Sequence, residues 1–190
     1  AEFANHEGAT IRLLLHSLAF GTLKPFIADE PNDAISQKNI EMTMDVMANS
    51  LVYYVQDVVR HGLMGPGGRV VGLTSAGSTR VLPSYGAVSA AKAALESYCR
   101  QLALELAPHA ITANTIRAGV TYTPALAKIP GNDVIMDNAF MRNPYHRLTT
   151  PDDVANVLRL LARDEAAWIN GEVIGVDGGE DAVDLTWWKK

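Results

Sequence analysis

The sequence contains a single cysteine, Cys99, so no disulfide can form within this chain. No run of apolar residues approaches the ~20 needed to cross a membrane, and no signal peptide is recognisable. The chain has 16 Lys and Arg against 21 Asp and Glu, a net charge of -5, which leaves no basic excess for nucleic acid. These absences favour a cytoplasmic protein whose partners include neither a membrane nor a nucleic acid.

The five histidines do not fall at metal-ligand spacings, so we expect no metal site. No Gly-x-Ser-x-Gly turn presents a serine as a hydrolase nucleophile. Internal repeats are also lacking. A hydrophobic content of 48% over 190 residues is enough to bury one substantial core, so the composition predicts a single domain.

The apolar patterning alternates between strand and helix. Four short apolar runs predict strands at residues 11–15, 70–74, 111–116 and 172–176. Helices are expected near residues 35–62, 85–106 and 152–163, with Pro31-Asn-Asp33 as the first start signal. Thr123-Pro124 resembles another helix start, but residues 125–147 lack a clean period. Strands that alternate with helices are typical of an α/β fold with a doubly wound parallel sheet.

A phenol and an ammonium group stand seven residues apart at the start of one predicted helix, as Tyr85 and Lys92. Seven residues are close to two helical turns, so the two side chains share a face. A lysine charge held near a tyrosine favours the phenolate, and we therefore expect Lys92 to lower the pKa of Tyr85. Such a pair suits proton or hydrogen-bond donation to a developing oxyanion, as in a reductase.

The segments around this pair resemble the carboxyl-terminal part of the short-chain dehydrogenase/reductase family. Arg69-Val-Val-Gly-Leu-Thr-Ser75 predicts a buried strand before the helix, and Gly171-Glu-Val-Ile-Gly-Val-Asp-Gly-Gly179 predicts a strand closed by a tight turn. The resemblance runs from Arg12 to Gly179. It implies a Rossmann-like fold and a nicotinamide cofactor, either NADH or NADPH.

The spacing of the pair points to one branch of that family. Most members have Tyr-x-x-x-Lys, but here Val88 stands four residues before Lys92. A Tyr-x6-Lys spacing is similar to that of the enoyl-acyl-carrier-protein reductase branch. His16-Ser-Leu-Ala-Phe-Gly21 also resembles the cofactor-flanking loop of that branch.

This resemblance implies a role for each matching residue. Tyr85 would hydrogen-bond an enolate oxygen, Lys92 would hold the nicotinamide ribose, and Ser75 would assist catalysis. The remaining cofactor contacts would come from Ser17, Leu18, Gly119, Thr121 and Thr123. Residues 124–147 would form a substrate-binding lid. The substrate would be an acyl-carrier-protein or CoA thioester in fatty acid biosynthesis, and the enzyme a homodimer or homotetramer. Apart from the resemblance, Trp187-Trp188 places two large apolar side chains on a short charged tail, which predicts either packing against a neighbouring subunit or a loose surface tail left from expression.

Two alternatives stay open. Ser75 lies thirteen residues before Val88, where a carbonyl reductase keeps its substrate-binding serine, so a ketone or 3-ketoacyl thioester is one alternative substrate. Carbonyl reductases also use an asparagine of the preceding helix in a proton relay. Alignment places Met47 there, with Asn49 two residues away, which favours the enoyl interpretation. From another class, the alternative is a catalytically inactive binding or assembly module.

The glycine-rich turn that receives the pyrophosphate in this family has no counterpart in the sequence. Gly65-Pro-Gly-Gly68 precedes a strand, so it predicts a helix-to-strand turn instead. The chain also begins Ala-Glu-Phe, without an initiator methionine. We therefore expect residues 1–190 to form a single Rossmann-like domain truncated at its N-terminal side, which binds dinucleotides poorly by itself.

Overall fold

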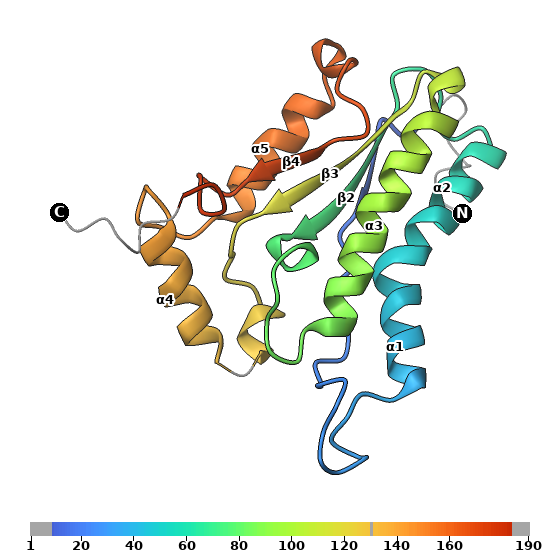
Figure 1. The fold of residues 1–190 in the computed structure, drawn as a ribbon. Coiled ribbons are helices and arrows are strands. Elements are labelled where there is room, and N and C mark those ends of the chain that lie inside the picture. The colour runs from blue at the N-terminus through green and yellow to red at the C-terminus, as the bar shows by residue number, and fades with distance from the viewer. Residues whose placement is uncertain (1–8, 130, 184–190) are drawn as a thin grey trace.

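The computed structural model describes residues 9–129 and 131–183, which fold into a parallel sheet with helices on both faces (Figure 1). The four strands are β1 (Leu13–His16), β2 (Arg69–Ser75), β3 (Thr112–Ala118) and β4 (Val173–Val176), in the order β1-β2-β3-β4. All three strand pairs are parallel. The predicted α/β class is confirmed, and all four strands lie where the sequence placed them within about two residues.

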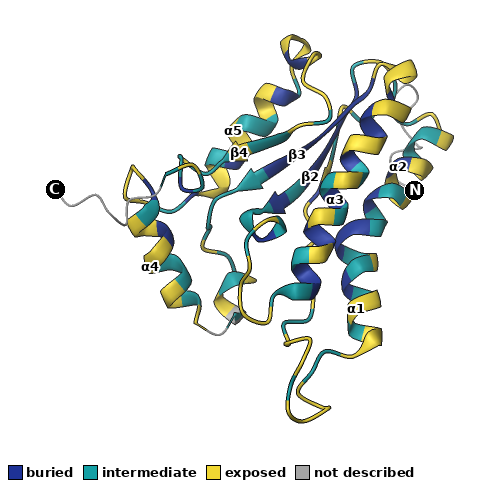
Figure 2. Ribbon diagram, in the orientation of Figure 1, coloured by how far each residue is buried: buried dark blue, intermediate teal, exposed yellow. Residues whose placement is uncertain are grey.

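One face of the sheet is covered by α3 (Gly86–Glu105) and by a long rod beside it. The rod consists of α1 (Gln37–Met44), a π-helical segment (Asp45–Asn49) and α2 (Ser50–Arg60). Their contact buries Met47, Leu51 and Leu95 almost completely. Figure 2 shows buried segments on α3 and on the neighbouring helix, next to exposed segments that face away from the sheet.

The other face is covered by α5 (Pro151–Leu161), which packs on Val71 and Ile116. Val70 belongs to the core on the α3 side and Val71 to the core on the α5 side, as the two-residue period of a strand requires. This arrangement explains why β2 reads as a continuous apolar run. It is buried on both faces, as parallel strands generally are.

Both ends of α5 are fixed by polar contacts. At its start, Thr150 and Asp153 form a reciprocal capping box. At its end, Arg12 Nε donates to the Ala162 carbonyl over 2.9 Å, and Arg69 Nε donates to the Leu161 carbonyl over 2.9 Å. Cations are favoured at the C-terminus of a helix, so Arg69 of β2 and Arg12, which precedes β1, stabilise this end of α5.

Two predicted helix features were wrong. The first helix was expected near residue 35 and begins at the cap Ser36, whose Oγ accepts the Asn39 amide hydrogen, but the predicted start signal at residues 31–33 lies in a separate turn. Thr123-Pro124 starts no regular α-helix. The Thr123 Oγ1 accepts the Leu126 amide hydrogen at the head of a 3-10 turn, Leu126–Lys128.

Another helix, α4 (Asn132–Arg142), lies in the stretch for which the sequence predicted no regular element. Its apolar side chains do not form one buried stripe, since Val134 is 58% exposed and Phe140 is 44% exposed. A helix that turns large apolar groups to several sides gives no clear periodic signal. Along the described part of the chain, no helix is both long and apolar enough to cross a membrane.

Candidate active site

A cleft of about 620 Å³ opens at the carboxyl ends of the strands. Ligands of open parallel α/β sheets bind at this edge, because the loops that follow neighbouring strands converge there. Its walls are mostly apolar. All eight residues singled out in the sequence line it: Ser17, Leu18, Ser75, Tyr85, Lys92, Gly119, Thr121 and Thr123. The structure therefore brings the whole predicted set together, while the role of each residue stays a prediction.

Tyr85 caps the start of α3 and is half-buried in the cleft wall. Burial raises the pKa of its phenol, and the nearby Ser75 hydroxyl opposes that rise only in part. The expectation that Lys92 lowers the pKa of Tyr85 was wrong, because desolvation outweighs any effect of the ammonium charge. The phenol is therefore neutral at physiological pH, the form that can donate a hydrogen bond.

Lys92 is 7% exposed, and its Nζ donates to the Leu73 carbonyl oxygen over 2.7 Å. Desolvation lowers the pKa of Lys92 to about 8, and the charge of Glu96 opposes this shift. Glu96 is held in place by Thr74, whose Oγ1 donates to Glu96 Oε1 over 2.6 Å. The ammonium group therefore keeps its charge at neutral pH, and a lysine has three donors, of which the Leu73 carbonyl takes one.

Ser75 ends β2, and its Oγ is buried without a hydrogen-bond partner among the described residues. Leaving a buried hydroxyl unpaired costs about 1–3 kcal/mol, so such groups call for an explanation. A ligand oxygen in the cleft would satisfy it. Together with the donors of Lys92, this set fits a ligand that carries ribose hydroxyls and a polarised carbonyl, as a nicotinamide cofactor and a thioester do.

The π-helical segment places Met47 and Asn49 on different sides of the rod. Met47 is 2% exposed and lines the cleft. Asn49 lies away from it, and its Oδ1 accepts a hydrogen bond from Tyr98 over 2.9 Å. At the position where the sequence alignment expects a carbonyl reductase's relay asparagine, the cleft therefore presents the apolar thioether of Met47.

His16 opens the segment that resembles a cofactor-flanking loop, but the sequence did not predict that its side chain is buried. Ser50 Oγ donates to the Val46 carbonyl, so it accepts from His16 Nε2 over 2.8 Å. Burial and the nearby Lys92 charge lower the pKa of His16, which favours its neutral form. The bond links the end of β1 to Ser50, the first residue of α2.

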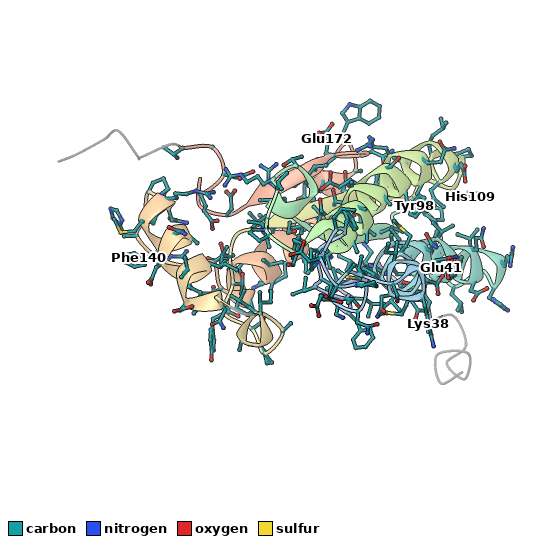
Figure 3. All side chains as sticks on the ribbon, turned by 60° about the horizontal axis from the view of Figure 1, so that its bottom comes forward. Lys38, Glu41, Tyr98, His109, Phe140 and Glu172 are labelled. Atoms are coloured by element: carbon teal, nitrogen blue, oxygen red, sulfur yellow. The ribbon has the colours of Figure 1, made fainter. Side chains whose placement is uncertain are left out.

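The segment predicted as a lid is closed at its base and anchored at one end. Thr121 and Thr149 form an isolated parallel bridge across its two ends. Leu126 and Ile129 line the cleft from the first half. The second half is α4, which lies beyond the carboxyl ends of the strands, with Phe140 on its outer side (Figure 1, Figure 3).

Asn143 anchors the end of α4. This side chain is 3% exposed, and its Nδ2 donates to the Asp177 carbonyl over 2.8 Å. The neighbouring Arg142 donates to the Glu180 carbonyl over 3.0 Å. Across residues 9–129 and 131–183, no group of three or more His, Cys, Asp or Glu side chains is placed to hold a metal ion.

Similarity to known proteins agrees with this site. A family model described as Enoyl-(Acyl carrier protein) reductase matches residues 1–180. The chain is 30% identical over 178 residues to the enoyl-[acyl-carrier-protein] reductase [NADH] of Aquifex aeolicus, covering 94% of this chain and 65% of that protein. It is 35% identical over 187 residues to the chloroplastic enoyl-[acyl-carrier-protein] reductase [NADH] of Arabidopsis thaliana, covering 96% of this chain and 46% of that protein.

Solved structures show the same relationship. The crystal structure of the Aquifex aeolicus enzyme aligns with a TM-score of 0.82 at 30% identity, covering 93% of this chain and 68% of that one. A reductase of Anaplasma phagocytophilum in complex with NAD aligns with a TM-score of 0.79 at 28% identity, and the alignment covers 94% of this chain and 64% of that one. The chain spans about half to two thirds of the length of the two curated relatives. It belongs to the enoyl-(acyl carrier protein) reductase family of short-chain dehydrogenases/reductases.

Proposed function

We propose that the protein reduces the carbon-carbon double bond of an enoyl thioester with NADH, as a step of fatty acid biosynthesis. One observation carries the proposal. In a member of this family, Tyr85, Lys92 and Ser75 converge on a single apolar cleft with the Tyr-x6-Lys spacing. The choice of NADH over NADPH is supported by the relatives, which are named as NADH enzymes.

When bound, the nicotinamide supplies the hydride that is added to the double bond. Tyr85 donates a hydrogen bond to the thioester oxygen, on which negative charge grows as the bond is reduced. Because burial keeps the phenol neutral, the donor is present before the charge develops. A fixed donor aimed at a developing charge stabilises the transition state without reorganisation of solvent.

Lys92 serves the cofactor side of the same cleft. Its ammonium is fixed by Leu73, so the remaining donors can hold ribose hydroxyls while the positive charge favours the growing oxyanion. Ser17, Leu18, Gly119, Thr121 and Thr123 would complete the contacts to this half of the cofactor. The thioester would be carried by an acyl carrier protein or by CoA, and its acyl chain would lie along the lid residues Leu126 and Ile129.

A direct comparison of two CoA thioesters tests the proposal. The full-length protein with NADH should reduce crotonyl-CoA and leave acetoacetyl-CoA unchanged. Ser75 favours the carbonyl-reductase alternative, whereas Met47 at the relay position opposes it. Reduction of acetoacetyl-CoA alone would establish that alternative. Tight NADH binding with no turnover of either thioester would show an inactive binding module.

A further inference from the structure

The ring of Tyr85 packs directly on the backbone of Gly77, in the 3-10 turn (Ala76–Ser78) that follows β2. Gly77 is buried, and a Cβ added there would lie 2.5 Å from Tyr85 Cε1 and 3.1 Å from Cδ1. Real Cβ atoms do not approach other heavy atoms so closely. The phenol occupies its place only because residue 77 has no side chain.

The same turn also brings the Ser75 hydroxyl to the ring. A Cβ at Gly77 would lie 3.3 Å from Ser75 Oγ, the buried hydroxyl that lacks a partner. On the other side, Ser84 immediately precedes the cap Tyr85 and has a φ of +59°, a left-handed conformation that is strained for a residue with a side chain. Backbone strain before Tyr85 and close packing beneath its ring together fix where the phenol points.

We propose that Gly77 is a positioning residue, which seats the Tyr85 ring so that its hydroxyl faces the substrate oxygen beside Ser75. The inference rests on the proposed function, because it assigns Gly77 a role in that reaction. Gly77 has no left-handed φ, so alanine is permitted by its backbone. The clash of Gly77→Ala therefore falls on a rotatable side chain, and the ring moves while the fold persists. A misplacement of about 1 Å at a reacting group can lower the rate about 100-fold.

A first test needs no activity and uses the whole 190-residue chain. Gly77→Ala should lower the Tm by several degrees, whereas the same change in a Tyr85→Ala background should lower it little, because the clashing ring is gone. Gly65→Ala is the matched control. A Cβ at Gly65 meets nothing within 4 Å, so its Tm should stay near the wild-type value. If Gly77→Ala lowers the Tm equally in the wild type and in Tyr85→Ala, the Tyr85 ring is not the group that requires a glycine at residue 77.

A second test measures turnover of crotonyl-CoA by the full-length protein. Gly77→Ala should lower kcat about 100-fold with a near-constant KM, because substrate binding survives while the donor is misplaced. In a Tyr85→Phe background, which has no hydroxyl to position, Gly77→Ala should cause no further loss. Gly65→Ala should leave both constants unchanged.

These outcomes separate the inference from the proposed function. If Tyr85→Phe retains full turnover, the proposed function is wrong, whatever the thermal test shows. If Tyr85→Phe loses turnover but Gly77→Ala does not, or if Gly77→Ala lowers kcat equally in both backgrounds, the positioning role is wrong. If Gly77→Ala does not fold, the double variant Gly77→Ala, Tyr85→Ala decides. A folded double variant supports the positioning role of Gly77, and an unfolded one overturns it.

Discussion

At the residue scale, the site is governed by desolvation more than by charge attraction. Burial raises the pKa of Tyr85 and lowers that of Lys92, so both groups are pushed toward their neutral forms. For the phenol, neutrality preserves a hydrogen-bond donor. For the ammonium, the shift stops at about 8, because Glu96 lies nearby. At neutral pH the site therefore combines a neutral phenol with an ammonium group that loses its proton more easily than a free lysine does.

The role of the donor predicts the effect of its removal. Tyr85→Phe keeps the ring on Gly77 but removes the hydroxyl, and losing one such donor lowers kcat about 100-fold or more. The fold should be nearly unaffected. Steady-state kinetics with crotonyl-CoA, beside a thermal melt, measure both effects.

Tyr98→Phe is the matched control, since it makes the same change on the same helix. It removes the bond to Asn49, outside the cleft, and should lower stability by about 1 kcal/mol while turnover stays intact. A Tyr85→Phe protein with wild-type kcat would contradict the assigned role.

The lowered pKa of Lys92 predicts a pH-dependent stability. Between pH 8 and 10.5 the unfolded chain holds a proton on this lysine that the folded chain has lost, so stability rises with pH. Below pH 8 both states are protonated and the burial penalty is fully present. In urea unfolding experiments, the free energy of unfolding of the wild type should rise by roughly 3 kcal/mol relative to that of Lys92→Met between pH 8 and 10.5.

The comparison isolates Lys92, since other groups titrate in both proteins. Cys99, for example, has its pKa raised to about 12 by burial, and its stabilising contribution is lost as pH rises above 9 in either protein. A constant difference between the two proteins from pH 8 to 10.5 would show that Lys92 is not desolvated as described.

Single residues mark how far the sequence could predict the site. The spacing of Tyr85 and Lys92 fixes one helical face, so their shared cleft was predictable. Their pKa shifts were not, because desolvation depends on tertiary packing that no local pattern encodes. Gly77 carries no sequence signal of its own, since its contact with the Tyr85 ring depends on the turn geometry.

At the element scale, the segment predicted as a lid, residues 124–147, combines a cleft-lining half with an anchored helix. The anchor is the buried Asn143, which donates to Asp177 and also accepts from the Tyr145 amide over 2.9 Å. Arg142 adds contacts to the carboxylates of Glu180 and Asp181, both at 3.8 Å. Any opening of the lid should therefore pivot about the end of α4, while its start moves.

Removing the anchor should loosen α4 selectively. Asn143→Ala leaves the Tyr145 amide and the Asp177 carbonyl without these partners, so stability should fall by about 1–3 kcal/mol. Amide hydrogen exchange along residues 132–142 should speed up. The exposed Asn138→Ala on the same helix should change neither quantity. If amide hydrogen exchange along α4 is the same in Asn143→Ala as in the wild type, Asn143 does not hold this helix in place.

Elements whose apolar side chains pack in the core with a regular period were predictable from the sequence, as β2 and α5 show. Thr150 and the aspartates of α5 form a local start signal that needs no tertiary context. α4 escaped prediction because it rests on polar anchors at its end and keeps Val134 and Phe140 partly in solvent. Its stability comes from contacts far apart in sequence, which periodicity does not report.

At the scale of the whole molecule, parallel strands in the order β1-β2-β3-β4 bring four loops to one sheet edge. The cleft there is built from three of them, together with α3 and α5. Lys92 is the one charged side chain among its described lining residues. Such a surface suits the nicotinamide half of a dinucleotide, whereas a pyrophosphate requires backbone amides at a helix N-terminus or several cations.

This distribution predicts how the 190-residue chain divides its affinity between the two halves of the cofactor. Calorimetry should find weak binding of NADH, with no micromolar component. Reduced nicotinamide mononucleotide, which lacks the adenosine phosphate half, should bind within about tenfold of NADH, a difference of at most about 1.4 kcal/mol. The two ligands share the nicotinamide and ribose that the proposed function places beside Lys92, so the control is Lys92→Met, which should weaken the binding of both equally. If NADH binds at micromolar concentrations, or far more tightly than the mononucleotide, the chain holds a pyrophosphate site that its cleft does not reveal.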